Sequence, residues 1–195
     1  MAAPIRGGII AAGAGSRLRA DGWRVPKPLV EVAGLPLIGA VLRNFTTAGI
    51  TAITIIVNQE ERDCVEWVRA RYPDLEVDFI VKTTASSLES FQEVTARGPD
   101  GPMLVSTVDA WCAAEDFARF AGQAAARPDE ATVLAVTPLV DDEKPRVASA
   151  VPRGGGGVHG DTSEGCAAAI ASANSRAAVS GRLSVERSAS GRASA

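Results

Sequence analysis

Residues Ile9–Ile38 read IIAAGAGSRLRADGWRVPKPLVEVAGLPLI. The stretch begins like a β-strand, breaks into small residues, and resumes with Lys27 held between Pro26 and Pro28. In an open α/β sheet, ligands bind beyond the carboxyl ends of the strands, near the point where the strand order reverses. A loop of alanines and glycines after a first strand would present backbone N–H groups there, with little side chain in the way. Such a loop can approach a base and wrap anionic phosphates.

Two cations accompany this glycine-rich turn. The guanidinium of Arg17 is a planar fork of donors suited to phosphate oxygens, and Lys27 adds a compact charge on a backbone stiffened by two prolines. The dinucleotide fingerprint fails because Leu18 holds its third glycine position, and no Gly-Lys-Ser/Thr follows to make a Walker motif. A glycine-rich turn alone is often structural, and single Arg or Lys residues are mostly solvated. Their combination in one short span favours a phosphate site.

Predicted strands and helices alternate from the N-terminus to about residue 137. The expected strands are Gly7–Ala12, Ile50–Val57, Leu75–Val81, Met103–Val108 and Ala131–Thr137. The expected helices are one from Pro36 to before Gly49, one N-capped by Asn58 and running to Tyr72, one over Ser87–Thr95 with Ser86 and Glu89 at capping-box spacing, and one over Glu115–Ala126. This alternation predicts a mostly parallel sheet with helices on both faces.

Composition bounds the class of protein. The 195 residues suffice for one domain, and 46% hydrophobic with 22% charged residues is ordinary for a soluble globular chain. A net charge of −3 does not indicate binding to nucleic acid or to an anionic membrane. The three widely spaced cysteines suit reduced thiols, and neither a signal peptide nor a bilayer-spanning run is evident. We therefore expect a cytoplasmic protein.

After about Arg146 the character of the chain changes. Residues 146–195 lack aromatic residues, contain four consecutive glycines, and are rich in Ala, Ser, Gly and Arg. We expect a folded domain over 1–145 and a low-complexity, disordered tail over 146–195, with at most a weak helix at Ala167–Ala178. His159 in this tail is expected to be idle. One hypothesis is that the segment arises from truncation or a frameshift in a GC-rich gene.

The opening motifs resemble the nucleotidyltransferases of the sugar-nucleotide pyrophosphorylase and MobA-like superfamily. Their signature is a strand ending in AAG, then GxGxR, a PKPL element and V-x-G-x-P-L-I; here these are AAGAGSR (Ala11–Arg17) and PKPLVEVAGLPLI (Pro26–Ile38). The resemblance covers about residues 5–145 and implies that 1–145 is a nucleotidyltransferase (NTP-binding) domain. It implies a Rossmann-like three-layer α/β/α fold, the GT-A-like fold of nucleotide-diphospho-sugar transferases. It also implies transfer of a nucleoside monophosphate from an NTP to a phosphorylated acceptor such as a sugar 1-phosphate, with release of pyrophosphate.

The resemblance assigns roles residue by residue. Arg17 would hold the triphosphate, Lys27 would stabilise charge near the α-phosphate, and Asp109 in STVDAW would bind Mg²⁺. The segment KTTASSLESF (Lys82–Phe91) falls where the family contacts base and sugar. The residues expected to bind nucleotide are Ala11, Ala12, Gly13, Gly15, Ser16, Thr84 and Ser87. Taken alone, a capped helix explains Lys82–Phe91 equally well, and a single Asp at a strand end is usually turn chemistry.

Two other classes stay open. The chain could be a nucleotide-binding pseudoenzyme or regulator that lacks the acceptor half of the domain. It could also be an oxidoreductase using the GxG turn, although the missing third glycine argues against that reading. The base, the acceptor, the oligomeric state and a second metal ligand are not specified by the sequence.

Overall fold

The computed structural model describes residues 4–126, 133–134 and 168–171. Its helices are α1 (Ser16–Ala20), α2 (Leu37–Thr47), α3 (Arg62–Arg71), α4 (Ser87–Thr95) and α5 (Ala114–Ala125), with a 3-10 turn η1 (Lys27–Leu29). Its strands are β1 (Arg6–Ala11), β2 (Glu31–Val32), β3 (Leu35–Pro36), β4 (Ala52–Val57), β5 (Glu76–Val81), β6 (Met103–Thr107), β7 (Val133–Leu134) and β8 (Ala168–Ala171). None of the helices in these ranges is long and apolar enough to cross a lipid bilayer.

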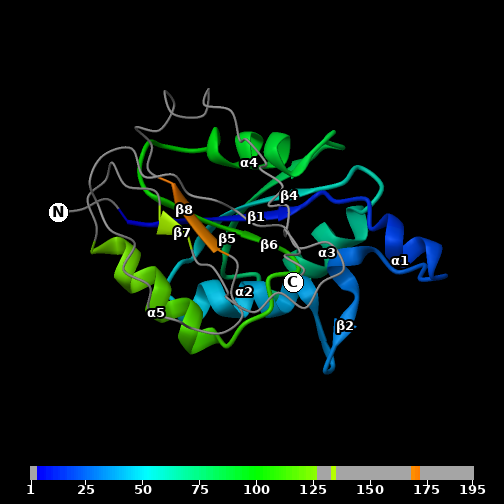
Figure 1. Ribbon diagram of the computed structural model, residues 1–195, viewed down its shortest axis with the longest axis horizontal. Coiled ribbons are helices and arrows are strands. Elements are labelled where there is room, and N and C mark those ends of the chain that lie inside the picture. The colour runs from blue at the N-terminus through cyan, green and yellow to red at the C-terminus, as the bar shows by residue number, and fades with distance from the viewer. Residues whose placement is uncertain (1–3, 127–132, 135–167, 172–195) are drawn as a thin grey trace, which may run out of the picture.

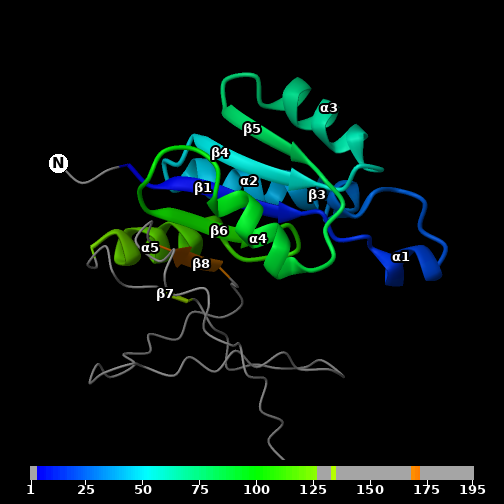
Figure 2. The same cartoon turned by 90° about the horizontal axis from the view of Figure 1, so that it is seen from above.

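The main sheet has the strand order β5-β4-β1-β6-β8-β7. The strands β5, β4, β1 and β6 are parallel, whereas β8 runs antiparallel to both β6 and β7. Figure 2 shows the parallel strands pointing toward the same edge, beside α1. The prediction of a mostly parallel sheet is confirmed. The short strands β2 and β3 form a separate hairpin.

Three layers make up the domain, as predicted (Figure 1). On one face of the sheet, α2, α3 and α5 pack against inward side chains such as Ile9, Ile55 and Leu104. On the other face, α4 packs its Val94 against a smaller cluster that includes Ile56 and Val105. Successive residues of a strand point to opposite faces, so β-branched runs such as AITIIV in β4 can supply both clusters.

Close approach of α4 to the sheet explains one glycine of β1. A Cβ atom built on Gly8 would lie 2.6 Å from Val94 Cγ1, closer than atoms can pack. Because Gly8 carries no side chain, Val94 can be completely buried over the centre of the sheet. The strand that carries the glycine-rich loop is thereby held between two helical layers.

Two local predictions are wrong. Asn58 does not cap a helix: α3 begins only at Arg62, with Glu61 at its N-cap. The Asn58 side chain instead accepts a hydrogen bond from the backbone N–H of Glu60 at 3.1 Å, which closes a turn ahead of the helix.

Residues Ala168–Ala171 form the strand β8 rather than part of a weak helix over Ala167–Ala178. Pairing with β6, in register from Met103 opposite Ala171 to Ser106 opposite Ala168, supplies backbone hydrogen bonds that override the helical preference of alanine. Within the predicted strand Ala131–Thr137, the structure describes Val133–Leu134 as β7. The remainder of 146–195, including His159, lies outside the described residues.

Candidate active site

The topology of the sheet identifies where a ligand would bind. The chain runs from β1 through α2 to β4 and through α3 to β5 on one side, and α4 then returns it across the opposite face to β6. The direction of strand addition therefore reverses between β1 and β6, and ligands of open α/β sheets bind beyond the carboxyl ends of strands at such a point. The loops that follow β1 and β6 contain the glycine-rich turn and Asp109.

The turn after β1 leaves its backbone accessible. Ala11 and Ala12 are buried, whereas Gly13 is exposed and a Cβ atom built on it would meet nothing within 4 Å. Gly15 has a φ of +58°, and its Cβ would lie 3.2 Å from the Cβ of Lys27. The left-handed backbone favours glycine at this position, and the missing side chain lets the Lys27 segment pack against the turn.

Lys27 and Asp109 meet at the switch point. The ammonium Nζ of Lys27 donates a 2.6 Å hydrogen bond to Oδ2 of Asp109, with 25% of the lysine and 50% of the aspartate side chain exposed. Two features position Lys27: it begins η1, and the Leu29 N–H bonds to the Pro26 carbonyl at 2.8 Å. Asp109 lies two residues beyond Thr107, the last residue of β6.

The electrostatics keep Asp109 ionised. Burial raises the pKa of this carboxyl. The hydrogen bond and positive charge of Lys27 lower it by more than burial raises it, so the pKa lies below its ordinary value. At neutral pH Asp109 is therefore a carboxylate paired with Lys27, and both side chains are partly open to solvent. Such a pair can exchange partners when a ligand brings its own charges.

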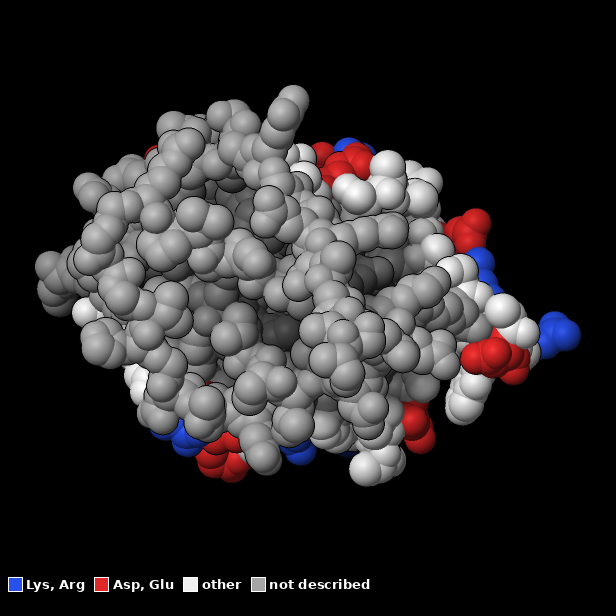
Figure 3. Space-filling model, in the orientation of Figure 1, with Lys and Arg blue, Asp and Glu red and all other residues white. Residues whose placement is uncertain are grey.

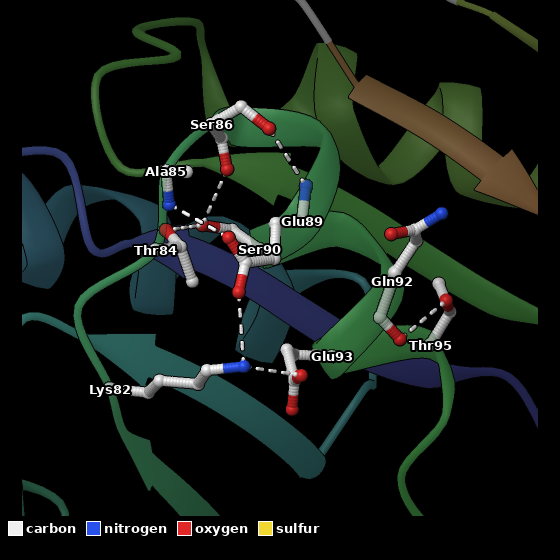
Figure 4. A network of polar contacts seen from close by, with 9 residues as sticks. All are labelled: Lys82, Thr84, Ala85, Ser86, Glu89, Ser90, Gln92, Glu93 and Thr95. Carbon is white, nitrogen blue, oxygen red and sulfur yellow. Dashed lines mark hydrogen bonds and ion pairs between the residues drawn. The ribbon is translucent and has the colours of Figure 1, made fainter.

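The loop between β5 and α4 is held by a polar network, shown in Figure 4. Lys82 forms ion pairs with Glu89 at 3.0 Å and Glu93 at 2.8 Å. The hydroxyl of Thr84 lies 2.7 Å from that of buried Ser90. The predicted capping interaction is confirmed, because Ser86 Oγ accepts from the Glu89 N–H at 3.2 Å. The Glu89 carboxylate in turn accepts from the Ala85 N–H at 2.7 Å, so this loop is fixed before any ligand binds.

Two polar residues of this region, Asn58 and Glu61, were not predicted from the sequence to take part in the site, since Asn58 was expected only as a helix cap. Asn58 is 4% exposed and bridges the turn after β1 and the loop after β5. Glu61 is 1% exposed, and its Oε2 has no hydrogen-bond partner. Burial raises the pKa of Glu61, although the nearby Arg19 and Lys27 oppose this shift. The property that distinguishes these two residues is their burial. The polar sequence NQEE (Asn58–Glu61) would be expected at the surface, so it does not predict that burial.

The structure places the predicted residues whose side chains it describes in two groups. Gly13, Gly15, Lys27 and Asp109 lie together at the switch point, and Ser16 begins α1 beside them. Thr84 and Ser87 lie on the other side of β4, in the loop after β5 and at the first residue of α4. The side chain of Arg17 lies outside the described part of the structure.

The same edge of the sheet carries exposed apolar side chains. The large hydrophobic residues exposed among the described residues all lie on segments at or near this edge: Trp23, Val25, Val32, Leu88 and Trp111. Acidic and basic side chains stand interspersed along the described margin near α1 in Figure 3. These exposed hydrophobic side chains are scattered over separate segments, which is normal for a protein surface.

The donor set bears on a divalent metal. Among the described residues, no group of three or more His, Cys, Asp or Glu side chains could hold a metal ion. Mg²⁺, however, is commonly bound through one or two carboxylates together with water and substrate phosphates. The single exposed carboxylate of Asp109 fits that second kind of site.

The family of the chain follows from a comparison of its sequence with known protein families. The model of the MobA-like NTP transferase domain matches residues 7–153. The chain belongs to this family. Membership gives no support to the oxidoreductase alternative.

Two proteins of similar sequence are named as nucleotidyltransferases. A mannose-1-phosphate guanyltransferase of Gibberella zeae is 33% identical over 115 residues, covering 55% of this chain and 31% of the relative. A 2-aminoethylphosphonate cytidylyltransferase of Lancefieldella rimae is 32% identical over 95 residues, covering 46% of this chain and 38% of the relative. The chain thus spans well under half of the length of these relatives.

Solved structures confirm the fold. A Bacillus anthracis protein described as a glucose-1-phosphate thymidylyltransferase superposes with a TM-score of 0.67 at 19% identity, covering 93% of this chain and 76% of that one. At that identity the likeness establishes the Rossmann-like architecture alone. It agrees with the three-layer fold and the parallel strands described above.

Proposed function

We propose that this member of the MobA-like NTP transferase family is a cytoplasmic nucleotidyltransferase. In the proposed reaction an acceptor phosphate or phosphonate oxygen attacks the α-phosphorus of a nucleoside triphosphate. A new bond joins that oxygen to the α-phosphorus, the bond to the β-bridging oxygen breaks, and pyrophosphate leaves with its electron pair. The observation that carries the proposal is the meeting of Lys27 and Asp109, 2.6 Å apart, beside the open turn at Gly13 and Gly15.

Each side chain has a role that follows from its chemistry. The backbone N–H groups of the turn at Ala12–Ser16 would contact the nucleotide, and Arg17 would bind triphosphate oxygens as a fork of donors. Lys27 would neutralise charge that develops around the α-phosphate in the transition state. Thr84 and Ser87 would contact base and sugar from the opposite side of β4. The protein thus contributes positioning and charge rather than a covalent intermediate.

A divalent ion is the proposed cofactor. Asp109 would hold Mg²⁺ as its carboxylate ligand, with the remaining positions left to water and triphosphate oxygens. When bound, such an ion neutralises phosphate charge and orients the groups that react. The chain's own part is to keep the Asp109 carboxylate ionised and at the end of β6, which the lowered pKa favours.

Two relatives support a class of acceptor for the proposed reaction. One is named for transfer to mannose 1-phosphate and another for transfer to 2-aminoethylphosphonate, so both acceptors present a phosphorus oxyanion. We propose an acceptor of that class for this chain. Exposed Trp111, two residues beyond Asp109, would border the acceptor position.

The test uses the full 195-residue chain. The protein is incubated with each of the four common ribonucleoside triphosphates and with mannose 1-phosphate, glucose 1-phosphate or 2-aminoethylphosphonate, with Mg²⁺ or with a chelator. Pyrophosphate is followed by a coupled assay and the product by ³¹P NMR, while calorimetry measures triphosphate binding separately.

Pyrophosphate release that requires both acceptor and Mg²⁺ would support the proposal. Triphosphate binding without turnover across the acceptor panel would point to the nucleotide-binding pseudoenzyme. Absence of any triphosphate binding would contradict the proposed function altogether.

A further inference from the structure

The side chain of Asn58 continues the cross-linking of the sheet beyond the last paired residues. The parallel pairing of β1 with β4 ends at Ala11 opposite Val57, and that of β4 with β5 ends at Val57 opposite Val81. Beyond these pairs the strands β1, β4 and β5 continue into separate loops at the candidate site. Asn58 is the first residue of β4's loop and is 4% exposed.

Each end of the Asn58 amide bonds to a different loop. The Nδ2 donates to the carbonyl of Ala12 at 3.4 Å, on the β1 side. The Oδ1 accepts from the hydroxyl of Thr83 at 3.1 Å, on the β5 side, and from the N–H of Glu60 at 3.1 Å. Since a carbonyl can only accept and a backbone N–H can only donate, these partners fix the orientation of the amide.

The two bridged loops contain most of the residues proposed to bind the nucleotide. Ala12 begins the glycine-rich turn, and Thr83 directly precedes Thr84. On its α4 side the second loop is already held through Ser90 and Glu89 (Figure 4), so Asn58 supplies the tie toward β1. A buried amide with three partners holds such a tie rigidly, because breaking it would strand polar groups away from water.

We infer that Asn58 is a positioning residue for nucleotide binding, which sets the separation between the glycine-rich turn and the Thr83–Thr84 segment on either side of β4. The inference rests on the proposed function. Asn58 acts through these two loops and not by contact with the reacting atoms. Its loss should weaken triphosphate binding more than it slows the chemical step.

Two variants separate the two arms of the bridge. Thr83→Val removes one hydroxyl from an exposed loop residue while keeping the size of the side chain. Asn58→Asp keeps the acceptor for Thr83 and Glu60 but places an oxygen against the Ala12 carbonyl. Thr95→Val is the matched control, because its hydroxyl bonds to Phe91 O within α4 at 2.9 Å.

We expect Thr83→Val and Asn58→Asp each to raise the KM and Kd for the triphosphate about three- to tenfold, the cost of about one hydrogen bond, with kcat within about twofold of wild type. Thr95→Val should leave KM unchanged. In nucleotide-free protein, hydrogen–deuterium exchange should accelerate at residues 12–16 in Asn58→Asp and at 83–86 in Thr83→Val. Asn58→Ala should accelerate both loops at once.

Unchanged exchange in both loops and an unchanged triphosphate Kd in Thr83→Val and Asn58→Asp would overturn the inference. A drop in kcat at constant KM would overturn it as well, because that pattern denotes a role in chemistry. Thr83→Val keeps the test decisive if the Asn58 variants do not fold. Failure of the wild-type protein itself to bind any triphosphate would instead be a failure of the proposed function.

Discussion

The Nζ atom of Lys27 lies 2.6 Å from Oδ2 of Asp109, although 82 positions separate the two residues in the chain. The contact joins η1, whose position follows from the turn after β1, to the end of β6 on the other side of the switch point. Each residue is the other's counterion in the nucleotide-free protein. In the proposed reaction the triphosphate would receive the lysine and a divalent ion would receive the carboxylate.

Replacing Lys27 by alanine should lower transferase activity by about ten- to a thousandfold, the effect of removing one charge-stabilising group. The fold should persist, because the lysine is a partly exposed loop residue. Steady-state pyrophosphate release and a circular dichroism spectrum check the two statements. Arg119→Ala is the control, since it removes an exposed cation that pairs with Asp116 within α5. Full turnover in folded Lys27→Ala protein would exclude Lys27 from the site.

The same ion pair makes a prediction about metal binding without nucleotide. Because the ammonium group occupies an oxygen of Asp109, Lys27→Met should bind Mn²⁺ more tightly than wild type, and Asp109→Asn should bind it more weakly. Electron paramagnetic resonance of free Mn²⁺ measures both affinities. Asp78→Asn, which changes an exposed carboxylate on β5, should leave the affinity unaltered. Equal affinity in wild type and Asp109→Asn would mean that the ion is held elsewhere.

Gly13→Ala should separate ligand binding from stability. A Cβ atom at this position meets no protein atom within 4 Å, so the variant should fold as well as wild type. Its methyl group would project toward the proposed nucleotide and raise the triphosphate KM by about tenfold or more, since small displacements of a bound substrate are costly. Gly122→Ala in α5, also in open space, should leave KM alone and raise the free energy of unfolding by about 0.5–1 kcal/mol.

Ser86→Ala should lower the free energy of unfolding by about 1 kcal/mol, because it removes the side-chain cap that accepts from the Glu89 N–H. Urea denaturation measures the loss. Ser87→Ala, one residue further along at an exposed position, is the comparison and should have a smaller effect. Equal losses in both variants would show that the cap contributes nothing particular to α4.

Cys64 should resist alkylation in the native protein. Burial, assisted by the charge of Glu61, raises the pKa of its thiol to about 12. The folded state therefore keeps a proton that the unfolded state releases near pH 9, and stability should fall as the pH rises above that value. Mass spectrometry after iodoacetamide treatment between pH 7 and pH 9 should find Cys64 unmodified until urea unfolds the chain. Rapid native modification would contradict this burial.

The sequence by itself determined the elements whose signals are local. Ser86 and Glu89 carry the capping pattern and α4 covers Ser87–Thr95 as predicted, because a cap is made by residues three apart in the chain. The β-branched run of β4 and the order of the glycine-rich and Pro-Lys-Pro motifs were likewise legible, since strand preference and turn chemistry depend on neighbouring residues. Family resemblance added the expected roles of Lys27 and Asp109.

Tertiary structure alone decided which of these residues meet. Asn58 is a residue type that often caps helices, and its side chain accepts the local hydrogen bond from the Glu60 N–H. Because β1 and β5 lie on either side of β4, the same side chain also bonds to Ala12 and Thr83 and links the two loops. The strand β8 forms from alanine-rich residues because β6 offers an unpaired edge, a partner more than sixty positions away. Lys27 and Asp109 likewise become neighbours only when the sheet brings the ends of β1 and β6 together. Contacts between distant segments depend on the packing of the whole domain. Local sequence preferences reflect only neighbouring residues, so they do not predict such contacts.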